Sequence, residues 1–314
     1  MGADLRRVED RLRDETRVNY PFIGEILTEL IAAGGKRLRP LLLLLAARPF
    51  DYELEQLLPA AAGVELLHTA SLIHDDTIDH AELRRGRPTL NSRISTETVI
   101  LFGDYIFARA AMLAAATMNP RVVGVFASTL GEICDGQLQE IFTTRQLEQS
   151  RDDYLRRIFG KTAALFAGSA EMGAILGQAA PDAVDALRRF GGDVGMAFQI
   201  IDDVLDLREN TAHLGKPSGL DLRQGTITLP TMMFVEQADG DGRELARRVI
   251  DGRASDREHE ELVRAIRASD ALSDALRVAE CYVAGAHAAL EPIPDGESRR
   301  MLAALADHSL RRTH

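Results

Sequence analysis

The sequence predicts an all-α protein, with residues 1–314 forming a single domain. Apolar residues recur at helical spacing along most of the chain, and the breaks between these stretches carry proline or glycine. No stretch alternates between apolar and polar residues for long enough to indicate a strand. Hydrophobic residues make up 46% of the chain, which is enough to bury a substantial core.

The expected helices follow one another from the first residues onward. Amphipathic spacing over about residues 4–33 is interrupted near Pro21 and ends at Gly34 and Gly35. Pro40 suits the first turn of the next helix, because a backbone N–H is not needed there. Further helices are expected over about residues 53–78, 91–118, 120–143, 151–178 and 181–207. The remaining features are a glycine-rich loop from His213 to Gly225, a helix over about 229–237, and turns at 239–242 and 292–296 between the last helices.

Composition and charge narrow the classes of protein. The formal net charge of −11 disfavours a nucleic-acid partner. The chain has two cysteines, Cys134 and Cys281, too few for a disulfide framework or a zinc set, which fits a reducing cytoplasm. The charged first residues lack an apolar signal core, and the apolar run Leu41 to Ala47 is far shorter than the roughly 20 residues that span a bilayer. We therefore expect a soluble, cytoplasmic protein without a transmembrane segment.

Two acidic motifs of identical spacing are the main functional signal. Each has two adjacent aspartates and a third one three residues further on: Asp75, Asp76 and Asp79, and then Asp202, Asp203 and Asp206. Residues four apart lie one above the other on a helix, so the outer carboxylates of each motif project from one face. Carboxylate oxygens suit Mg²⁺, which keeps several waters and binds through a few carboxylates together with substrate phosphates. Two such faces aimed at each other would hold a diphosphate through bridging metal ions.

Acid-rich helical stretches are more often solvated faces, so each motif by itself leaves that alternative open. The preceding residues favour a buried or cleft-lining site instead. Leu66 and Leu67 come shortly before the first motif, and residues 196–201 before the second are mostly apolar. Carboxylates at the end of a core-facing stripe are costly to bury without a partner or ligand.

Two basic clusters stand out in this acidic chain: Lys36, Arg37 and Arg39 after a glycine turn, and Arg84, Arg85 and Arg87 after the first acidic motif. Arginine offers a fork of donors that matches phosphate oxygens, and lysine adds a point charge. The clusters predict a phosphate site that needs no metal. A solvated basic surface is the alternative, above all for Arg37 and Arg87.

Gly160, Lys161 and Thr162 look like the end of a nucleotide-binding P-loop. That motif needs a glycine five residues before Gly160 and a preceding strand, but position 155 is leucine and no strand is expected there. We reject the P-loop. A lone lysine in a helix is most often solvated, so Lys161 gains meaning only in combination with the other motifs.

Six motifs occur in one order along the chain: residues 34–40 (GGKRLRP), 75–79 (DDTID), 84–89 (RRGRPT), 161–162 (KT), 198–206 (FQIIDDVLD) and 215–217 (GKP). Each is weak alone, but six in register are not expected by chance. Together they resemble the trans polyprenyl diphosphate synthases over about two thirds of the chain. The resemblance implies an all-helical isoprenoid-synthase bundle around a deep central cavity, usually as a homodimer.

The resemblance also implies a reaction and the residues that perform it. An allylic diphosphate and isopentenyl diphosphate would condense head to tail to give a polyprenyl diphosphate and pyrophosphate. Three Mg²⁺ ions would be held by Asp75, Asp79 and Asp202, with support from Asp76, Asp203 and Asp206. The same diphosphate would contact Arg84, Lys161 and Lys216, while the developing allylic cation would face Thr162 and Gln199. Isopentenyl diphosphate would be held by Lys36, Arg39, His68 and Arg85.

His68 on an apolar helix would otherwise be assigned to the core, which is the more common place for a histidine there. Its spacing favours the site, because residues 68, 71, 75 and 79 share one helical face. After condensation, a proton is expected to pass to the departing diphosphate, since no side chain is an obvious dedicated base.

Two small residues, Ala70 and Ser71, lie about one turn before the first acidic motif. Short-chain members of the family that this sequence resembles carry Phe or Tyr at one of these positions. An isoprene unit is about 5 Å long, close to the helical pitch of 5.4 Å, so each open turn admits roughly one more unit. The residues that would next close the pocket for the growing chain are Leu67 and, after it, Leu66 and Gly63. We expect a long product, beyond geranylgeranyl, with a geranylgeranyl or farnesyl diphosphate synthase as the alternative.

One position departs from the family pattern, because Thr226 follows Gly225 where many members carry lysine, so one diphosphate contact is missing. Two other functions are less favoured. A class I terpene cyclase usually has an Asn/Asp-Ser/Thr-Glu second metal site, whereas here the aspartate motif is repeated. A non-catalytic partner subunit tends to lose both motifs, which are intact here. Peripheral membrane contact during product release is also compatible with the sequence.

Overall fold

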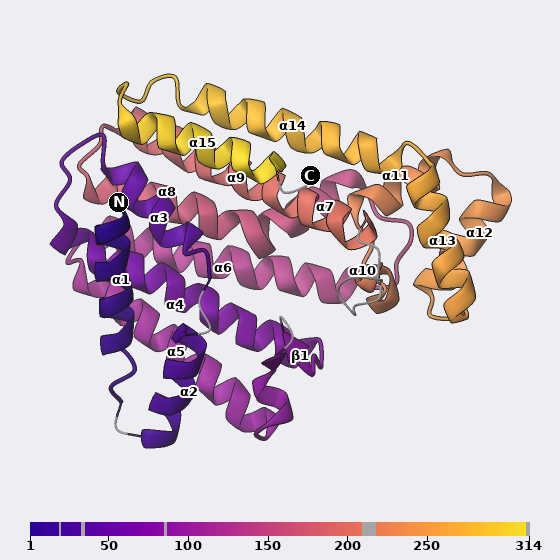
Figure 1. Ribbon diagram of the computed structural model, residues 1–314, viewed down its shortest axis with the longest axis horizontal. Helices are drawn as coiled ribbons and strands as arrows, with labels where there is room; N and C mark the ends of the chain where they lie inside the picture. Colours follow the sequence, from indigo (N-terminus) through magenta and orange to yellow (C-terminus); the bar gives the residue numbers. More distant parts are fainter. Residues whose placement is uncertain (19, 33–34, 85–86, 209–217, 312–314) are drawn as a thin grey trace. The chain divides into compact units, whose positions relative to one another are not determined.

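The computed structural model describes residues 1–18, 20–32, 35–84, 87–208 and 218–311. Helices dominate these residues (Figure 1), so the all-α prediction is confirmed. The first half contains α1 (Gly2–Asp14), α2 (Pro21–Ala32), α3 (Leu38–Ala47), α4 (Leu54–Ile78), the 3-10 helix η1 (Leu90–Ser92), α5 (Thr96–Ala116) and α6 (Pro120–Thr143). The second half contains α7 (Arg151–Ile158), the π-helical turn η2 (Phe159–Ala163), α8 (Ala164–Leu176), α9 (Pro181–Arg208), α10 (Leu220–Gln224), α11 (Leu229–Gln237), α12 (Gly240–Ile250), α13 (Asp256–Ala268), α14 (Ala271–Ala289) and α15 (Glu297–Arg311).

The chain forms two compact units, each built from three separate segments. Unit 1 contains Met1–Gly131, Leu165–Gly191 and Pro292–Leu302. Unit 2 contains Glu132–Ala164, Gly192–Glu291 and Ala303–His314. Helices α6 and α9 contribute residues to both units, so neither unit is a continuous piece of the sequence. The organisation as one domain stays a prediction.

Unit 1 is organised around α4, which packs against α1, α3 and α5. Its close contact with α5 depends on glycines: a Cβ added to Gly63 would lie 3.2 Å from the Ala110 carbonyl oxygen, and one on Gly103 only 2.3 Å from His74 Nε2. Gly173 plays the same part where α8 meets α3, since its Cβ would lie 2.1 Å from the Leu43 carbonyl oxygen. A larger residue at these glycines would push the helices apart.

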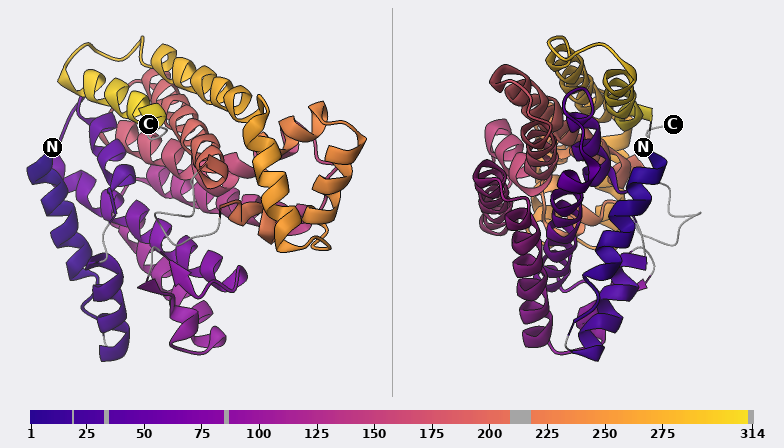
Figure 2. Two further views of the ribbon diagram at one scale, coloured as in Figure 1. Left: turned by 45° about the vertical axis from the view of Figure 1, so that its right-hand side comes forward. Right: turned by 90° about the vertical axis from the view of Figure 1, so that its left-hand side faces the viewer.

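Unit 2 contains a set of shorter helices that pack in pairs, including α11 with α14 and α12 with α13. Figure 2 shows α12 and α13 as a pair of orange helices. Both helices carry buried apolar side chains, among them Val249 and Ile250 in α12 and Leu262 and Ile266 in α13. Burial of each such side chain stabilises the fold by about 1.5–3 kcal/mol before the loss of conformational entropy is counted.

The expected helix boundaries agree closely for α4, α6, α9 and α11 but are wrong at four places. The helix expected over 91–118 begins only at Thr96, because the 3-10 helix η1 occupies Leu90–Ser92. The helix expected over 151–178 is interrupted by η2, where the Ala164 N–H donates to the Phe159 carbonyl oxygen five residues back. The loop expected between His213 and Gly225 contains α10, and 213–217 lie outside the described residues. The turn expected at 239–242 is instead the start of α12, with Asp239 accepting the Gly242 N–H.

A small strand pair also departs from the expectation of no strands. β1 (Leu83–Arg84) pairs antiparallel with β2 (Arg87–Pro88), with Leu83 opposite Pro88 and Arg84 opposite Arg87. Each strand has only two residues, which is too short to leave an alternating pattern in the sequence.

Helix α5 is the one described helix that is long and apolar enough to cross a membrane, judged by length and composition alone. In the sequence, Asp104 and Arg109 interrupt the apolar run of this helix. Both charged residues have protein partners: Arg109 bonds to the buried Glu15, the C-cap residue of α1, and Asp104 lies 3.5 Å from His74 of α4. One apolar helix is weak evidence for a span, because core helices pass the same test.

Candidate active site

The first acidic motif occupies the end of α4, in unit 1. Asp79 is the C-cap residue, and its N–H donates to the Asp75 carbonyl oxygen at 2.8 Å, so the helical spacing of the outer carboxylates is kept. His68, Ser71 and Asp75 are partly accessible and Asp79 is exposed, whereas Leu67 and Ala70 are fully buried. The predicted site residues therefore lie on the accessible part of α4, where Thr69, Leu72 and His74 are also partly accessible.

The middle carboxylate of this motif, Asp76, is joined to an arginine. Arg84 on β1 donates from Nε to both Asp76 carboxylate oxygens, each at 2.8 Å. Burial raises the pKa of Asp76, and the neighbouring Arg84 guanidinium acts in the opposite direction. Asn91 secures the same region, because its amide donates to the Asp76 carbonyl oxygen at 2.8 Å. Arg84 therefore lies beside the motif, its contact with a diphosphate stays a prediction, and Arg85 lies outside the described residues.

The first basic cluster divides into residues with different surroundings. Arg37 is the left-handed N-cap of α3, with φ 48°, and its guanidinium bonds to the buried Glu65 at 2.6 Å and to the Ile31 carbonyl oxygen. The solvated-surface alternative for Arg37 is therefore wrong, because this side chain is a buried structural partner. Arg39 lies with its guanidinium carbon 4.7 Å from the centre of the Phe166 ring, and Lys36 is exposed. Roles for Lys36 and Arg39 in substrate binding stay predictions.

In unit 2, two glycines position Lys161. A Cβ on Gly136 of α6 would lie 2.4 Å from the Lys161 backbone nitrogen, and one on Gly160 would lie 2.6 Å from the Glu132 carbonyl oxygen. The backbones of α6 and η2 are therefore in direct contact, which only glycine permits. One turn after Gly136, Glu140 forms an ion pair with the Lys161 ammonium group. π-Helical turns are rare and often occur at functional sites.

Thr162 and Gln199, both predicted to face the allylic cation, are bonded to each other. Thr162 Oγ1 donates to Gln199 Oε1 at 2.6 Å, and Gln199 Nε2 donates to Asp203 Oδ1 at 2.8 Å. The other Asp203 oxygen accepts the Tyr154 hydroxyl at 2.6 Å. Burial raises the pKa of Asp203 to about 7, although the hydrogen bonds from Tyr154 and Gln199 act to lower it. The side chains form one continuous chain from α7 to η2.

The outer aspartates of the second motif lie on the accessible side of α9. Asp202 and Asp206 are partly accessible, whereas Asp203 and Val204 between them are buried. Asp206 also receives the first backbone N–H groups of α10, from Leu220 at 3.1 Å and Asp221 at 3.3 Å. One predicted metal ligand therefore also anchors the chain where it enters α10. The predicted Lys216 lies outside the described residues.

The position of the missing family lysine is part of a tight turn. Gly225 is left-handed, with φ 83°, and the Thr226 N–H donates to the Asp221 carbonyl oxygen at 2.8 Å. Burial raises the pKa of Asp221 well above its ordinary value, and the nearby Asp206, Asp203 and Glu140 act in the same direction. Lys161 is the cation that opposes this effect.

Three residues of unit 2 belong to this region but were not among the predicted site residues: Tyr154, Glu140 and Asp221. Gln199 and Asp203 are four residues apart on α9, so their contact was readable from the sequence. Tyr154 is 49 residues from Asp203, and helical periodicity carries no signal for a contact between two different helices at that separation. The acidic motif itself gave a hint of such a contact. A middle aspartate that becomes buried on folding needs hydrogen-bond donors from elsewhere in the fold.

Comparison with known proteins gives a consistent result over the whole chain. A family model described as polyprenyl synthetase matches residues 20–267. Heptaprenyl diphosphate synthase component 2 of Geobacillus stearothermophilus is 40% identical over 307 residues, which cover 98% of this chain and 95% of the relative. The crystal structure of a decaprenyl diphosphate synthase from Rhodobacter capsulatus matches with a TM-score of 0.94 at 38% identity, covering 100% of this chain and 97% of its own.

A second solved structure carries ligands. It is a polyprenyl synthase from Caulobacter crescentus CB15, complexed with calcium and isoprenyl diphosphate. It matches with a TM-score of 0.92 at 34% identity, covering 100% of this chain and 96% of its own. Similarity of this extent and identity fixes both the fold and the family.

Proposed function

The chain belongs to the polyprenyl synthetase family, and from this premise we propose that it condenses an allylic diphosphate with isopentenyl diphosphate to give a long-chain all-E polyprenyl diphosphate. The observation that carries the proposal is that each acidic motif has accessible outer aspartates and a cation close by. Arg84 is bonded to Asp76 in the first motif. Lys161 precedes Thr162, which is linked through Gln199 to the second motif.

Divalent ions fit the donors that the chain supplies. Asp75 and Asp79 are one turn apart at the accessible end of α4, and Asp202 and Asp206 are one turn apart on α9. Within the described ranges, no group of three or more His, Cys, Asp or Glu side chains is gathered closely enough to hold a metal ion. Mg²⁺ suits such sparse sites, because it keeps several waters and takes phosphate oxygens from the substrate. We propose three Mg²⁺ ions, with Asp75, Asp79 and Asp202 as ligands and Asp76 and Asp206 in support.

When bound, the ions neutralise negative charge on the diphosphate oxygens and so make pyrophosphate a better leaving group. The side chains of the protein add to this effect. Arg84 and Lys161 are held by carboxylates and need only small movements to share their donors with a diphosphate. Thr162 and Gln199 direct neutral polar groups toward the allylic cation, so they stabilise it without reacting with it.

The length of the product is proposed from residues on α4. Ala70 and Ser71 are small, and the next side chains toward the start of the helix are the buried Leu67 and Leu66. A chain growing along this helix meets no aromatic side chain on α4 itself at these positions. We expect Ala70→Phe to shorten the product by at least one isoprene unit, while Thr69→Phe, on a neighbouring face of α4, leaves the length unchanged. Mass spectrometry of the products measures both variants.

The proposed assembly is a homodimer that uses the exposed side of α5. Leu101 and Met112 on this helix are 68% and 64% exposed, and Met118 just after it is 87% exposed. Exposed apolar side chains gathered on one helix are typical of surfaces that are covered in an assembly, whereas single exposed ones are common on any protein. Leu101→Glu combined with Met112→Glu should convert a dimer to a monomer in size-exclusion chromatography with light scattering. Phe22→Glu, which alters an exposed phenylalanine of α2, is the control.

One set of incubations tests the reaction against its alternatives. The isolated chain is given farnesyl and isopentenyl diphosphates with Mg²⁺, and the products are identified by mass spectrometry. Products longer than C20 support the proposal, whereas a reaction that stops at C15 or C20 contradicts the long-chain assignment. Conversion of a prenyl diphosphate without isopentenyl diphosphate would indicate a cyclase. Inactivity of the isolated chain would indicate a subunit that needs a partner.

The exposed thiols of Cys134 and Cys281 suit the proposed location in the cytoplasm.

A further inference from the structure

We propose that Tyr154 is a positioning residue for the reaction: its hydroxyl holds Asp203 so that Gln199, and through it the Thr162 hydroxyl, has one fixed hydrogen-bonding direction. The inference rests on the proposed prenyl transfer. It goes beyond that function, because it assigns a role to a tyrosine on α7 that lies outside every motif found in the sequence.

Each hydrogen bond in this network has a defined direction. The Tyr154 hydroxyl donates to one Asp203 oxygen and the Gln199 amide donates to the other, so both oxygens act as acceptors. Gln199 must therefore present its NH₂ group to Asp203 and its carbonyl oxygen to Thr162. Thr162 in turn must donate its single hydroxyl proton to that oxygen. The lone pairs of the Thr162 hydroxyl are then what this group offers to its surroundings, and lone pairs are what stabilise a carbocation.

Tyr154 is needed in addition to Gln199 because it fixes the orientation of the Asp203 carboxyl group. Asp203 is 3% exposed, so little water can reach an oxygen that loses its donor. Without the Tyr154 hydroxyl, the carboxyl group would have to rotate toward another donor, which would break its bond with Gln199 and allow the Gln199 amide to turn over. Thr162 would then face an NH₂ group and would accept from it with one lone pair, so its proton would point elsewhere.

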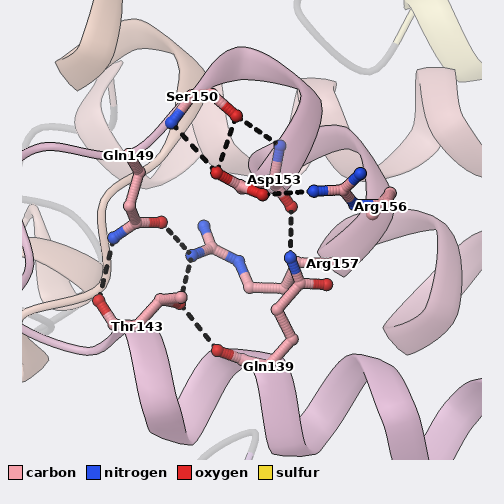
Figure 3. A network of polar contacts seen from close by, with 7 residues as sticks. All are labelled: Gln139, Thr143, Gln149, Ser150, Asp153, Arg156 and Arg157. Atoms are coloured by element: carbon pink, nitrogen blue, oxygen red, sulfur yellow. Dashed lines mark hydrogen bonds and ion pairs between the residues drawn. The ribbon is translucent and has the colours of Figure 1, made fainter.

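Tyr154 itself is held in place by the residues around its ring. Its ring is fully buried, and the Arg157 guanidinium carbon lies 5.6 Å from the ring centre. Figure 3 shows that Arg157 is in turn held by the Gln149 side chain at 3.0 Å and by Thr143. Arg157 also donates to the Ile227 carbonyl oxygen at 2.5 Å. Arg157, which lies beside the tyrosine ring, is therefore held by α6, by the segment before α7 and by the chain before α11.

The start of α7 is fixed by the same network. Ser150 and Asp153 form a capping box, in which each side chain bonds to the backbone N–H of the other residue. Gln139 of α6 donates to the Asp153 carbonyl oxygen at 3.0 Å, as Figure 3 shows. Tyr154 follows directly after this anchored turn. At the other end of the chain of hydrogen bonds, Thr162 is held in η2 by the contact between Gly136 and Gly160.

Tyr154→Phe tests the inference with the whole chain, farnesyl and isopentenyl diphosphates and Mg²⁺. We expect kcat to fall by about tenfold or more, with KM for both substrates within about twofold, because orientation of the transition-state environment is lost and not substrate contact. The matched control is Tyr52→Phe, which removes another tyrosine hydroxyl bonded to an aspartate, Asp4 at 3.0 Å, where no predicted site residue lies. It should keep the wild-type kcat.

A double-mutant cycle separates positioning from a general structural effect. If Tyr154 acts through Thr162, then Thr162→Val with Tyr154→Phe should be no slower than Thr162→Val alone. An unchanged kcat in Tyr154→Phe, or losses that multiply in the double variant, would overturn the inference while leaving the proposed function in place. A wild-type chain that makes no prenyl product would overturn the proposed function first, and this inference with it.

A second pair of variants decides the point should Tyr154→Phe fail to fold by circular dichroism. Thr162→Ser keeps the hydroxyl and should retain kcat within about twofold, whereas Thr162→Val removes it and should lose about tenfold or more. Equal activity of the serine and valine variants would overturn the inference, because the direction of the hydroxyl would then have no consequence for the reaction.

Discussion

The two acidic motifs have the same spacing but hold their middle aspartates by different means. Asp76, in the first motif, is bonded to the cationic Arg84, whose side chain is 38% exposed. Asp203, in the second, is bonded to two neutral donors, Tyr154 and Gln199, and is 3% exposed. In both motifs the middle carboxylate is occupied by the protein, and the outer aspartates lie on the accessible side of their helix.

This difference indicates a division of labour between the motifs. An arginine that is partly in water can exchange its carboxylate for a phosphate at small cost, so the first motif can bring charge to a substrate. A buried carboxylate with neutral donors cannot move without leaving polar groups unsatisfied, so the second motif fixes direction. Two motifs with the same aspartate spacing therefore serve as an adaptable anchor in one unit and a rigid one in the other.

The largest effects are expected where the motifs are alike, at their outer aspartates. Asp75→Asn and Asp202→Asn should each lower kcat by about 10³-fold, because each removes a charged oxygen ligand for Mg²⁺. Steady-state kinetics with Mg²⁺ and both diphosphates measures the loss. Asp185→Asn, on an exposed position of α9, is the control and should leave kcat unchanged. A small effect in one motif alone would assign the metal ions to the other motif.

The free energy of unfolding should respond differently to substitution of the two middle aspartates, Asp76 and Asp203. Asp203→Ala leaves the buried Tyr154 hydroxyl and the Gln199 amide without an acceptor, so we expect a loss of about 2–4 kcal/mol in the free energy of unfolding. Asp76→Ala leaves Arg84, which can reach water, and should cost about 1 kcal/mol or less. Urea unfolding followed by circular dichroism compares the two variants. Equal losses would contradict the distinction between a rigid and an adaptable motif.

The sequence predicted those parts of the structure that depend on local chemistry. Helices α6 and α9 begin at Pro120 and Pro181, where proline suits a first turn, and α11 has the expected bounds. The interruption at η2 could not be predicted, because one inserted residue leaves the apolar spacing of residues 151–178 nearly unchanged. The burial of individual charged side chains could not be predicted from the sequence either. Lys36 and Arg37 are neighbours in one basic cluster, yet only Arg37 bonds to the buried Glu65.

The sequence also predicted the part of the candidate site that lies within short motifs. These motifs contain residue types whose chemistry indicates a function, namely the outer aspartates, Lys161, Thr162 and Gln199. Tyr154 and Glu140 are contributed by other helices, and a lone tyrosine or glutamate in a helix carries no such signal. The residues that position the reacting groups therefore emerge only when the packing of the helices is known.

A smaller effect is expected from the carboxylates that hold the two cations. Glu140→Gln loosens Lys161, and Asp76→Asn loosens Arg84, so each should lower kcat/KM for the allylic diphosphate by about 3- to 10-fold. The Glu140 effect should vanish in a Lys161→Gln background, because Glu140 acts through the lysine. Losses that multiply in the double variant would show that Glu140 acts on the reaction by another route.

The smallest expected effect is a pH dependence confined to unit 2. His259 of α13 is 5% exposed, and its Nε2 lies 3.0 Å from the Gly219 carbonyl oxygen, directly before the α10 turn that Asp206 anchors. Burial lowers the pKa of His259, with the neighbouring Arg223 acting in the same direction and Asp256 and Glu260 opposing it. The folded state thus favours the neutral imidazole. Its contribution to stability is present above the unfolded pKa of about 6.5 and is lost as the pH falls through the lower folded value.

The wild-type chain should therefore lose stability between pH 7 and pH 5 beyond what the His259→Gln variant loses. Glutamine keeps a donor for the Gly219 carbonyl oxygen but has no proton to gain, so it isolates the titration from the contact. Urea midpoints of the two proteins at both pH values measure the difference. Asp76 would act in the opposite direction, because burial raises the pKa of its carboxyl group and its titration therefore favours the folded state as the pH falls. A wild-type chain that loses no more stability than His259→Gln between these pH values would contradict the assignment to His259.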